Sequence, residues 1–186
     1  QNLDAGNRLL WRQNSRRLDA ESLRDAVLAV SGKLDLKMFG PGYRDFDYKE
    51  EYAPVYTYIT ADQPALWRRS IYRFVVRTSP DPFLTTLDCP NAANLTPTRN
   101  VTTTALQSLA LLNSEFMLKQ AGHFAARLSA QPDSTTAVHV TMAFQSAFGR
   151  KPAIDELNAS IAFVDSNGLT EFCRVLLNAN EFVYID

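Results

Sequence analysis

The prolines of this chain are concentrated in its middle. Seven of the nine lie between residues 38 and 102, the zone 103–186 holds the other two, and the zone 1–37 holds none. Because proline lacks an N–H donor and obstructs the preceding helical turn, this middle zone disfavours long helices and regular sheets. The flanking zones carry apolar residues at helical spacing. We therefore expect a mainly α fold, an irregular helical bundle with a long proline-rich loop region at 38–102 and at most a minor β element.

Length and composition narrow the class of protein. A chain of 186 residues can bury one substantial core and is short for two ordinary domains, so we expect a single helical domain over residues 1–186. It starts at Gln1 without a leader sequence, which suggests a fragment of a larger protein. A net charge of −1 argues against a nucleic-acid-binding surface, and no apolar run is long enough to span a membrane.

Helix signals are clearest outside the middle zone. Asp19 is a good N-cap for a helix that ends near Gly32, and residues 7–17 suggest a short helix with its arginines outward. The stretch 105–113 (ALQSLALLN) is apolar almost all round and uncharged, which predicts a helix buried on most sides. After it, Ser114 can cap a helix with one apolar stripe and a polar opposite side. The stripe consists of Met117, Ala121, Phe124 and Leu128; Gln120, His123 and Arg127 lie opposite.

The middle zone holds the candidate ligand residues. From Pro64 we expect a helix on which Arg69, Arg73 and Arg77 recur at i, i+4 and i+8. Such a row suits an anionic polymer, a carboxylate ligand or an acidic partner domain; the alternative is a solvated helix face. The long connection at 78–102 is rich in polar residues, which either line a pocket or tie the loop down. The remaining candidates are Asp88, Asn91, Arg99 and Asn100 in this loop, and His123 beyond it.

Cysteine and histidine are too scarce for a familiar metal or haem site. The chain has two of each, and no pair has the spacing of zinc ligands or of a haem attachment sequence. We therefore expect no metal site and no cofactor. Cys89 and Cys173 leave two alternatives open, a disulfide if the chain resides outside the cytoplasm or two free thiols.

Four long strings resemble one known family. They are NRLLWRQNSRRLDAESLRDAVLAVSGKLD, RRSIYRFVVRTSPDPFLTTLDCPN, TPTRNVTTTALQSLALLN and FCRVLLNANEFVYID. Together they resemble the family called domain of unknown function 1553, the C-terminal module of large planctomycete proteins that often carry a cytochrome-c-like domain. The resemblance implies an exported (periplasmic or extracellular) multidomain protein, with the other domains of that protein and polysaccharide as partners. It implies no catalytic residue.

Three functions follow from these observations. The first is an uncharacterised helical scaffold or interaction module that docks against the rest of its parent protein. The second is a binding module for an anionic or carbohydrate ligand, which would use the arginines together with the tyrosines between Tyr43 and Tyr58. The third is part of a polysaccharide-processing enzyme, which would need acidic or basic groups that converge on a cleft. Its candidates are Asp81, Asp88, Glu115, His123 and Glu181. We expect the first function and assign no catalytic residue.

Overall fold

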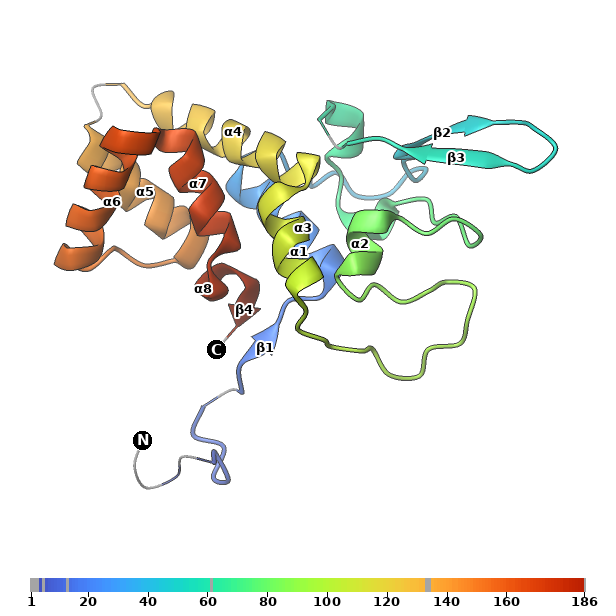
Figure 1. Cartoon of the computed structure of the whole chain (residues 1–186), viewed down its shortest axis with the longest axis horizontal. Coiled ribbons are helices and arrows are strands. Elements are labelled where there is room, and N and C mark those ends of the chain that lie inside the picture. Colours follow the sequence, from blue (N-terminus) through green and yellow to red (C-terminus); the bar gives the residue numbers. More distant parts are fainter. Residues whose placement is uncertain (1–3, 5, 13, 61, 133–134, 186) are drawn as a thin grey trace.

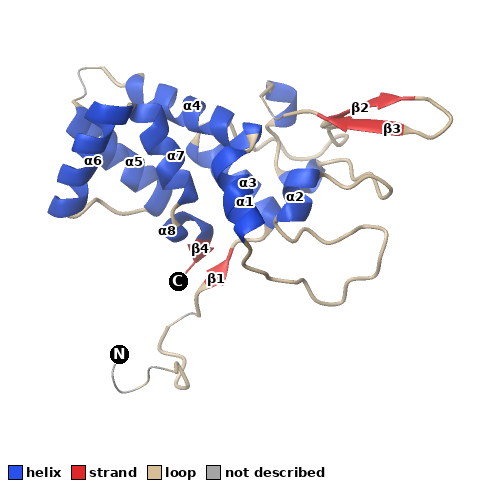
Figure 2. Cartoon of the chain, in the orientation of Figure 1, coloured by secondary structure: helices blue, strands red, loops and turns tan. Residues whose placement is uncertain are grey.

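The computed structural model describes residues 4, 6–12, 14–60, 62–132 and 135–185. Within these ranges the chain is mainly α-helical, with two small antiparallel strand pairs, which confirms the predicted fold class (Figure 2). No helix in the described ranges has the length and apolarity needed to cross a bilayer. The helices are α1 (Ala20–Val30), α2 (Pro82–Thr86), α3 (Ala105–Asn113), α4 (Glu115–Ser129), α5 (Thr136–Phe148), α6 (Ile154–Asn167), α7 (Leu169–Asn178) and α8 (Asn180–Val183).

The strands tie distant parts of the chain together. β1 (Arg16–Arg17) pairs with β4 (Tyr184–Ile185), so the segment after α8 docks against the segment before α1. β2 (Phe46–Lys49) pairs with β3 (Val55–Tyr58) in a hairpin that extends from the helices (Figure 1).

The core lies where α4 and α7 pack side by side, with α1 against α4 and with α5 and α6 beside α7 (Figure 1). The predicted stripe of α4 is buried, and the cluster continues through α1, α5 and α7 because each of these helices has an apolar face. Gln120 departs from the prediction. Its side chain is fully buried and accepts a 2.7 Å hydrogen bond from Ser31 Oγ, since the end of α1 covers that side of α4.

The predicted helix from Pro64 does not form. Pro64–Leu66 and Ser70–Tyr72 are single 3₁₀ turns, and Arg69 and Arg73 have extended backbone conformations. The main chain here bonds across to other segments: Asp35 N donates to Trp67 O. Tyr43 N donates to Tyr72 O, and Phe74 N donates to Tyr43 O. These non-local bonds replace the helical ones, so the arginines do not form a row on one helix face.

Two other helix predictions are corrected. Residues 7–17 form turns and then β1, so the expected short helix is wrong. α3 is a helix, but it lies at the surface and the centre is occupied by α4 and α7. Leu106, Leu109 and Leu112 are 64%, 54% and 39% exposed. The absence of charged residues from this helix therefore indicates an exposed apolar face.

Candidate functional site

The proline-rich zone and α1 line a cavity of about 410 Å³, which we call the arginine cavity. Three of the four arginines singled out in the sequence, Arg69, Arg73 and Arg99, line it together with Cys89. A neighbouring cavity of about 230 Å³ under residues 80–92 shares Arg73, Cys89 and Arg99 in its lining. Arg77 lines neither cavity. The loop after α2 thus both packs against α1 and covers space that charged and apolar side chains line together.

Most of the charge in this cavity is already paired. Arg99 donates two hydrogen bonds, of 2.8 and 2.9 Å, to the carboxylate of Glu21, which projects from the first turn of α1. Burial of Glu21 opposes ionisation, but the Arg99 contact outweighs it and lowers the pKa of Glu21. Arg69 makes no ion pair with any residue in the described ranges and is exposed. It is therefore the guanidinium of this cavity that can receive an anion.

Arg73 belongs to a buried cluster. Its Nε lies 2.5 Å from Asp45 Oδ2, and its Nη2 lies 3.5 Å from Asp81 Oδ2. Burial disfavours the charged forms and raises the pKa of Asp45 even though Arg73 opposes the shift. For Arg73 the two carboxylates outweigh burial, so the pKa of the guanidinium is raised. This arginine holds the base of the β2–β3 hairpin to the start of α2.

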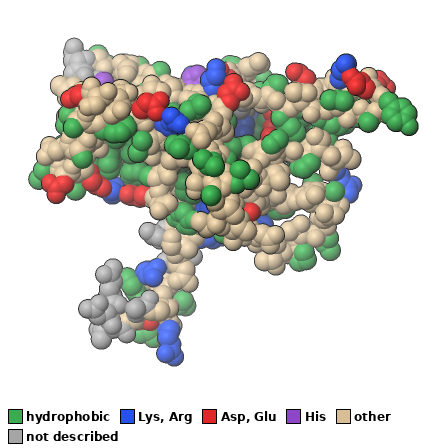
Figure 3. All heavy atoms as spheres, viewed as in Figure 1, with side chains coloured by type: hydrophobic (Ala, Val, Ile, Leu, Met, Phe, Trp, Pro, Cys, Tyr) green, Lys and Arg blue, Asp and Glu red, His purple; other side chains and the backbone are tan. Residues whose placement is uncertain are grey.

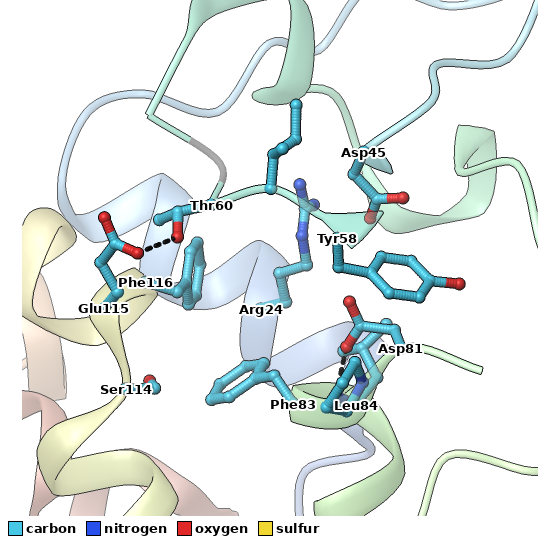
Figure 4. A pocket seen from close by; sticks show the side chains of 12 residues that line it. Arg24, Asp45, Tyr58, Thr60, Asp81, Phe83, Leu84, Ser114, Glu115 and Phe116 are labelled. Atoms are coloured by element: carbon cyan, nitrogen blue, oxygen red, sulfur yellow. Dashed lines mark hydrogen bonds between the residues drawn. The ribbon is translucent and has the colours of Figure 1, made fainter. Parts of the chain in front are cut away.

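A third cavity, of about 200 Å³, lies on the other side of this cluster (Figure 4). Asp45 and Asp81 face the Tyr58 ring there, and the Phe83 and Phe116 rings form the apolar wall, 5.4 Å apart. Asp81 accepts a 2.7 Å bond from Leu84 N and so caps α2. Glu115 also lines this cavity, and its carboxylate accepts a 2.7 Å bond from the Thr60 hydroxyl.

The other loop candidates hold the chain in place. Asp88, at φ +64°, accepts bonds from Arg17 Nη2 at 2.6 Å, Thr102 N at 2.8 Å and Gln107 Nε2 at 3.1 Å. Burial opposes ionisation of Asp88, but these donors prevail and lower its pKa. Asn91 Oδ1 accepts Ala93 N at 2.9 Å in a local turn. Asn100 lies beside the Arg17–Asp88 contact at the edge of a very small cavity.

His123 lines none of the cavities described above. Its Nε2 lies 2.8 Å from Asp62 Oδ1, and its ring meets the Trp67 ring edge-on at 5.8 Å. The hydrogen bond from His123 lowers the pKa of Asp62. Neither residue lines the arginine cavity, so His123 acts as a tie between α4 and the segment near residue 62.

The five acid–base candidates do not converge. Asp81 and Glu115 both line the cavity of about 200 Å³, but both carboxylates already accept hydrogen bonds. Asp88 and His123 have the separate partners described above, and Glu181 pairs with Arg150. This arrangement gives no support to acid–base catalysis by the predicted set.

The cysteines are both free thiols in the structure, so the disulfide left open by the sequence is not formed. Cys173 is buried within α7, whereas Cys89 is half-buried at the arginine cavity. Burial raises the pKa of Cys173 to about 12 and that of Cys89 to about 11, so neither is a ready nucleophile. In the part of the chain that the structure describes, no three His, Cys, Asp or Glu side chains are placed to hold a metal ion.

Comparison with known families agrees with the resemblance found in the sequence. The family described as "Protein of unknown function (DUF1553)" matches residues 1–164, which is most of the chain. The chain belongs to the DUF1553 family. No curated protein and no solved structure shows significant similarity to it. The family description names no activity, so the function of this DUF1553 chain has to be argued from its geometry.

Several residues that build these sites were not singled out in the sequence of the DUF1553 chain. Arg24 sits in the apolar stripe of α1, and its guanidinium donates to Leu66 O at 2.6 Å and to Arg68 O at 3.1 Å. Asp45 and Arg17 likewise lie beside apolar neighbours. A charged residue within an apolar stripe is the available signal, since a buried charge requires partners.

Proposed function

We propose that this DUF1553 chain is a helical interaction module that docks against other domains of an exported parent protein. The observation that carries this proposal is the exposed apolar face of α3. Single exposed leucines are common, but a contiguous row is a feature of interaction surfaces. Figure 3 shows apolar side chains gathered on the side of the molecule that carries α3. The row consists of Leu106, Leu109 and Leu112.

The ends of α3 are fixed, so the row is presented in a defined geometry. Thr104 and Gln107 form a reciprocal capping box at its start. At its end, Arg174 of α7 donates to Leu112 O at 2.9 Å and to Asn113 Oδ1 at 3.1 Å. A partner that covers this face would bury apolar surface without first having to order the helix.

The test compares α3 with a control surface in the complete parent protein. Leu109→Ser should raise hydrogen exchange across α3 in the parent protein and weaken binding of the separately expressed neighbouring domains by about tenfold, or roughly 1.4 kcal/mol. Ile154→Ser is the matched control, because Ile154 is 78% exposed on α6. The proposal fails if α3 exchanges equally fast with and without the neighbouring domains, or if both variants weaken binding equally.

A second candidate function is binding of a carboxylate-bearing sugar in the 410 Å³ cavity. It is supported by the guanidinium of Arg69 at the edge of this cavity, which forms no ion pair with any described residue, because guanidinium groups bind carboxylates through two hydrogen bonds. The paired state of Arg73 and Arg99 limits it, since an anionic ligand would have to compete with Asp45 and Glu21.

Titration with tetragalacturonate tests the second function. Arg69→Ala should weaken binding about tenfold, as expected for loss of a charged hydrogen bond. Arg77→Ala should leave the affinity unchanged, because Arg77 is exposed and lies outside the cavity. Equal effects of the two substitutions would show non-specific attraction and remove this candidate.

A further inference from the structure

We propose that the loop of residues 36–42, which we call the anchor loop, inserts its apolar side chains into an anionic lipid surface. The loop follows α1 and does not include the α3 face, so the inference is independent of the proposed docking function. Three features carry it: the exposure of its apolar side chains, the way its backbone is held, and the charge around it.

The anchor loop leaves three large apolar side chains in water. Leu36, Met38 and Phe39 are 68%, 58% and 77% exposed. They lie within four consecutive positions, and Lys37 is the residue that separates them. This is a local apolar projection rather than the scattered exposure that most protein surfaces show.

A clamp built from Arg68 and Tyr72 holds the loop backbone. The Arg68 guanidinium donates to three carbonyl oxygens of this region: Pro41 O at 2.7 Å, Phe39 O at 2.8 Å and Lys37 O at 3.2 Å. The same guanidinium lies 3.9 Å from the centre of the Tyr72 ring. Tyr72 Oη in turn accepts a 2.9 Å hydrogen bond from Phe39 N. The loop is therefore ordered before any partner arrives.

The clamped conformation is strained at the residue it presents. Phe39 has φ +63°, a left-handed conformation that bulky side chains rarely adopt. Such strain persists only where surrounding contacts impose it, and it is common at binding sites. Because the Phe39 side chain stays exposed, its burial in this chain cannot compensate for the strain. Contact between the Phe39 side chain and a partner would compensate for the strain.

The charge beside the anchor loop indicates an anionic surface. Residues 33–44 contain Lys33, Lys37 and Arg44 against Asp35, a net charge of +2 in a chain whose total is −1. Arg68 adds a further positive charge within the clamp. Apolar side chains flanked by basic ones are the arrangement by which peripheral proteins insert into anionic bilayers. Lys37 can extend its stem along the apolar residues and keep its ammonium at the headgroups.

Vesicle co-sedimentation of the whole chain tests the proposal. The protein should bind vesicles of phosphatidylcholine mixed with phosphatidylglycerol, bind pure phosphatidylcholine far more weakly, and dissociate as salt is raised. Phe39→Ser should lower the partition coefficient about tenfold. Ile154→Ser is the matched control, since it removes an apolar side chain that is also highly exposed, at 78%, from α6. Circular dichroism should show both variants folded, because both positions are exposed.

Three results would overturn the proposal. The first is no binding to the mixed vesicles by the unsubstituted protein. The second is binding that Phe39→Ser leaves unchanged or that Ile154→Ser reduces equally. The third is self-association that Phe39→Ser abolishes in the absence of lipid binding, which would assign the anchor loop to a contact between proteins.

Discussion

Replacement of Arg17 should destabilise the fold more than replacement of any exposed arginine. Its side chain is 7% exposed and lies where β1, the loop after α2 and the start of α3 meet. It donates to Asp88 Oδ2 at 2.6 Å, to Thr102 O and Gln107 Oε1 at 2.7 Å each, and to Leu87 O at 3.3 Å. Arg17→Met keeps much of the apolar stem but removes all four bonds.

The expected loss follows from the partners left behind. Asp88, whose side chain is 16% exposed, would keep its charge without a cation, and two backbone carbonyls would lose a donor. Breaking a buried ion pair on one side costs about 3–5 kcal/mol. In a chain of this size that corresponds to a fall in Tm of about 6–20 °C. Asp88→Asn should relieve part of the loss, because asparagine tolerates positive φ and no longer carries the uncompensated charge.

Urea unfolding followed by circular dichroism measures these values, with Arg16→Met as the control. Arg16 is the adjacent residue of β1 and is exposed, so its replacement should change the unfolding free energy by less than about 0.5 kcal/mol. The loss of unfolding free energy in the double variant Arg17→Met, Asp88→Asn should be smaller than the sum of the two single losses by about 1–3 kcal/mol. An Arg17→Met variant within about 1 kcal/mol of the unsubstituted protein would refute the reasoning.

Three further predictions concern backbone space and pH. Gly42→Ala should destabilise by about 1–3 kcal/mol in urea melts, because its Cβ would lie 2.7 Å from Tyr72 O; an unchanged midpoint would contradict this. Gly122→Ala in α4, where a Cβ meets no atom of the described residues within 4 Å, should stabilise by about 0.5–1 kcal/mol, and a loss would show hidden crowding. Hydrogen bonds from Arg150 lower the pKa of Glu156 to about 2, so the stability they confer is complete above its ordinary value of 4.5 and is lost as pH falls through about 2. In Glu156→Gln this acid-dependent decline should be smaller; an identical decline would exclude the contact as its source.

The sequence predicts the structure correctly where the local spacing of apolar residues agrees with their burial in the fold. α4 and α7 carry apolar residues at helical spacing and lie at the centre, so Met117, Phe124 and Leu177 are buried as such a pattern requires. The fold class could be predicted in the same way, whereas the family was indicated by the resemblance of four long strings. The segment after α7 docks on the core because docking removes the apolar side chains of Phe182 and Val183 from water.

The sequence was insufficient where distant segments decide the local structure. The stretch after Pro64 has helical spacing, but its backbone bonds to residues 35 and 43, which no local pattern reveals. The sequence pattern places Gln120 on the polar side of its helix, but Ser31 at the end of α1 covers that side and buries it. The apolar composition of α3 was misinterpreted because hydrophobicity alone does not distinguish a central helix from an exposed one.

The candidate site was predicted in its residue types but not in its geometry. Arg69, Arg73 and Arg99 do meet at one cavity, yet they reach it from turns and loops rather than from one helix face. Their partners Asp45 and Glu21 are far away in sequence, so the sequence could not show that Arg73 and Arg99 are neutralised. Arg77 lines neither cavity, because the segment that carries it does not form one helix with Arg69 and Arg73.

The pairing of β1 with β4 has a mechanical consequence. Arg16 lies opposite Ile185 and Arg17 opposite Tyr184, so the chain enters and leaves the fold at one point. A pulling force applied through both ends would open this pair one bond at a time, like a zipper, instead of shearing it as a block. The strand pair should therefore yield at low tension, while the helices behind it remain packed until the Arg17 contacts break.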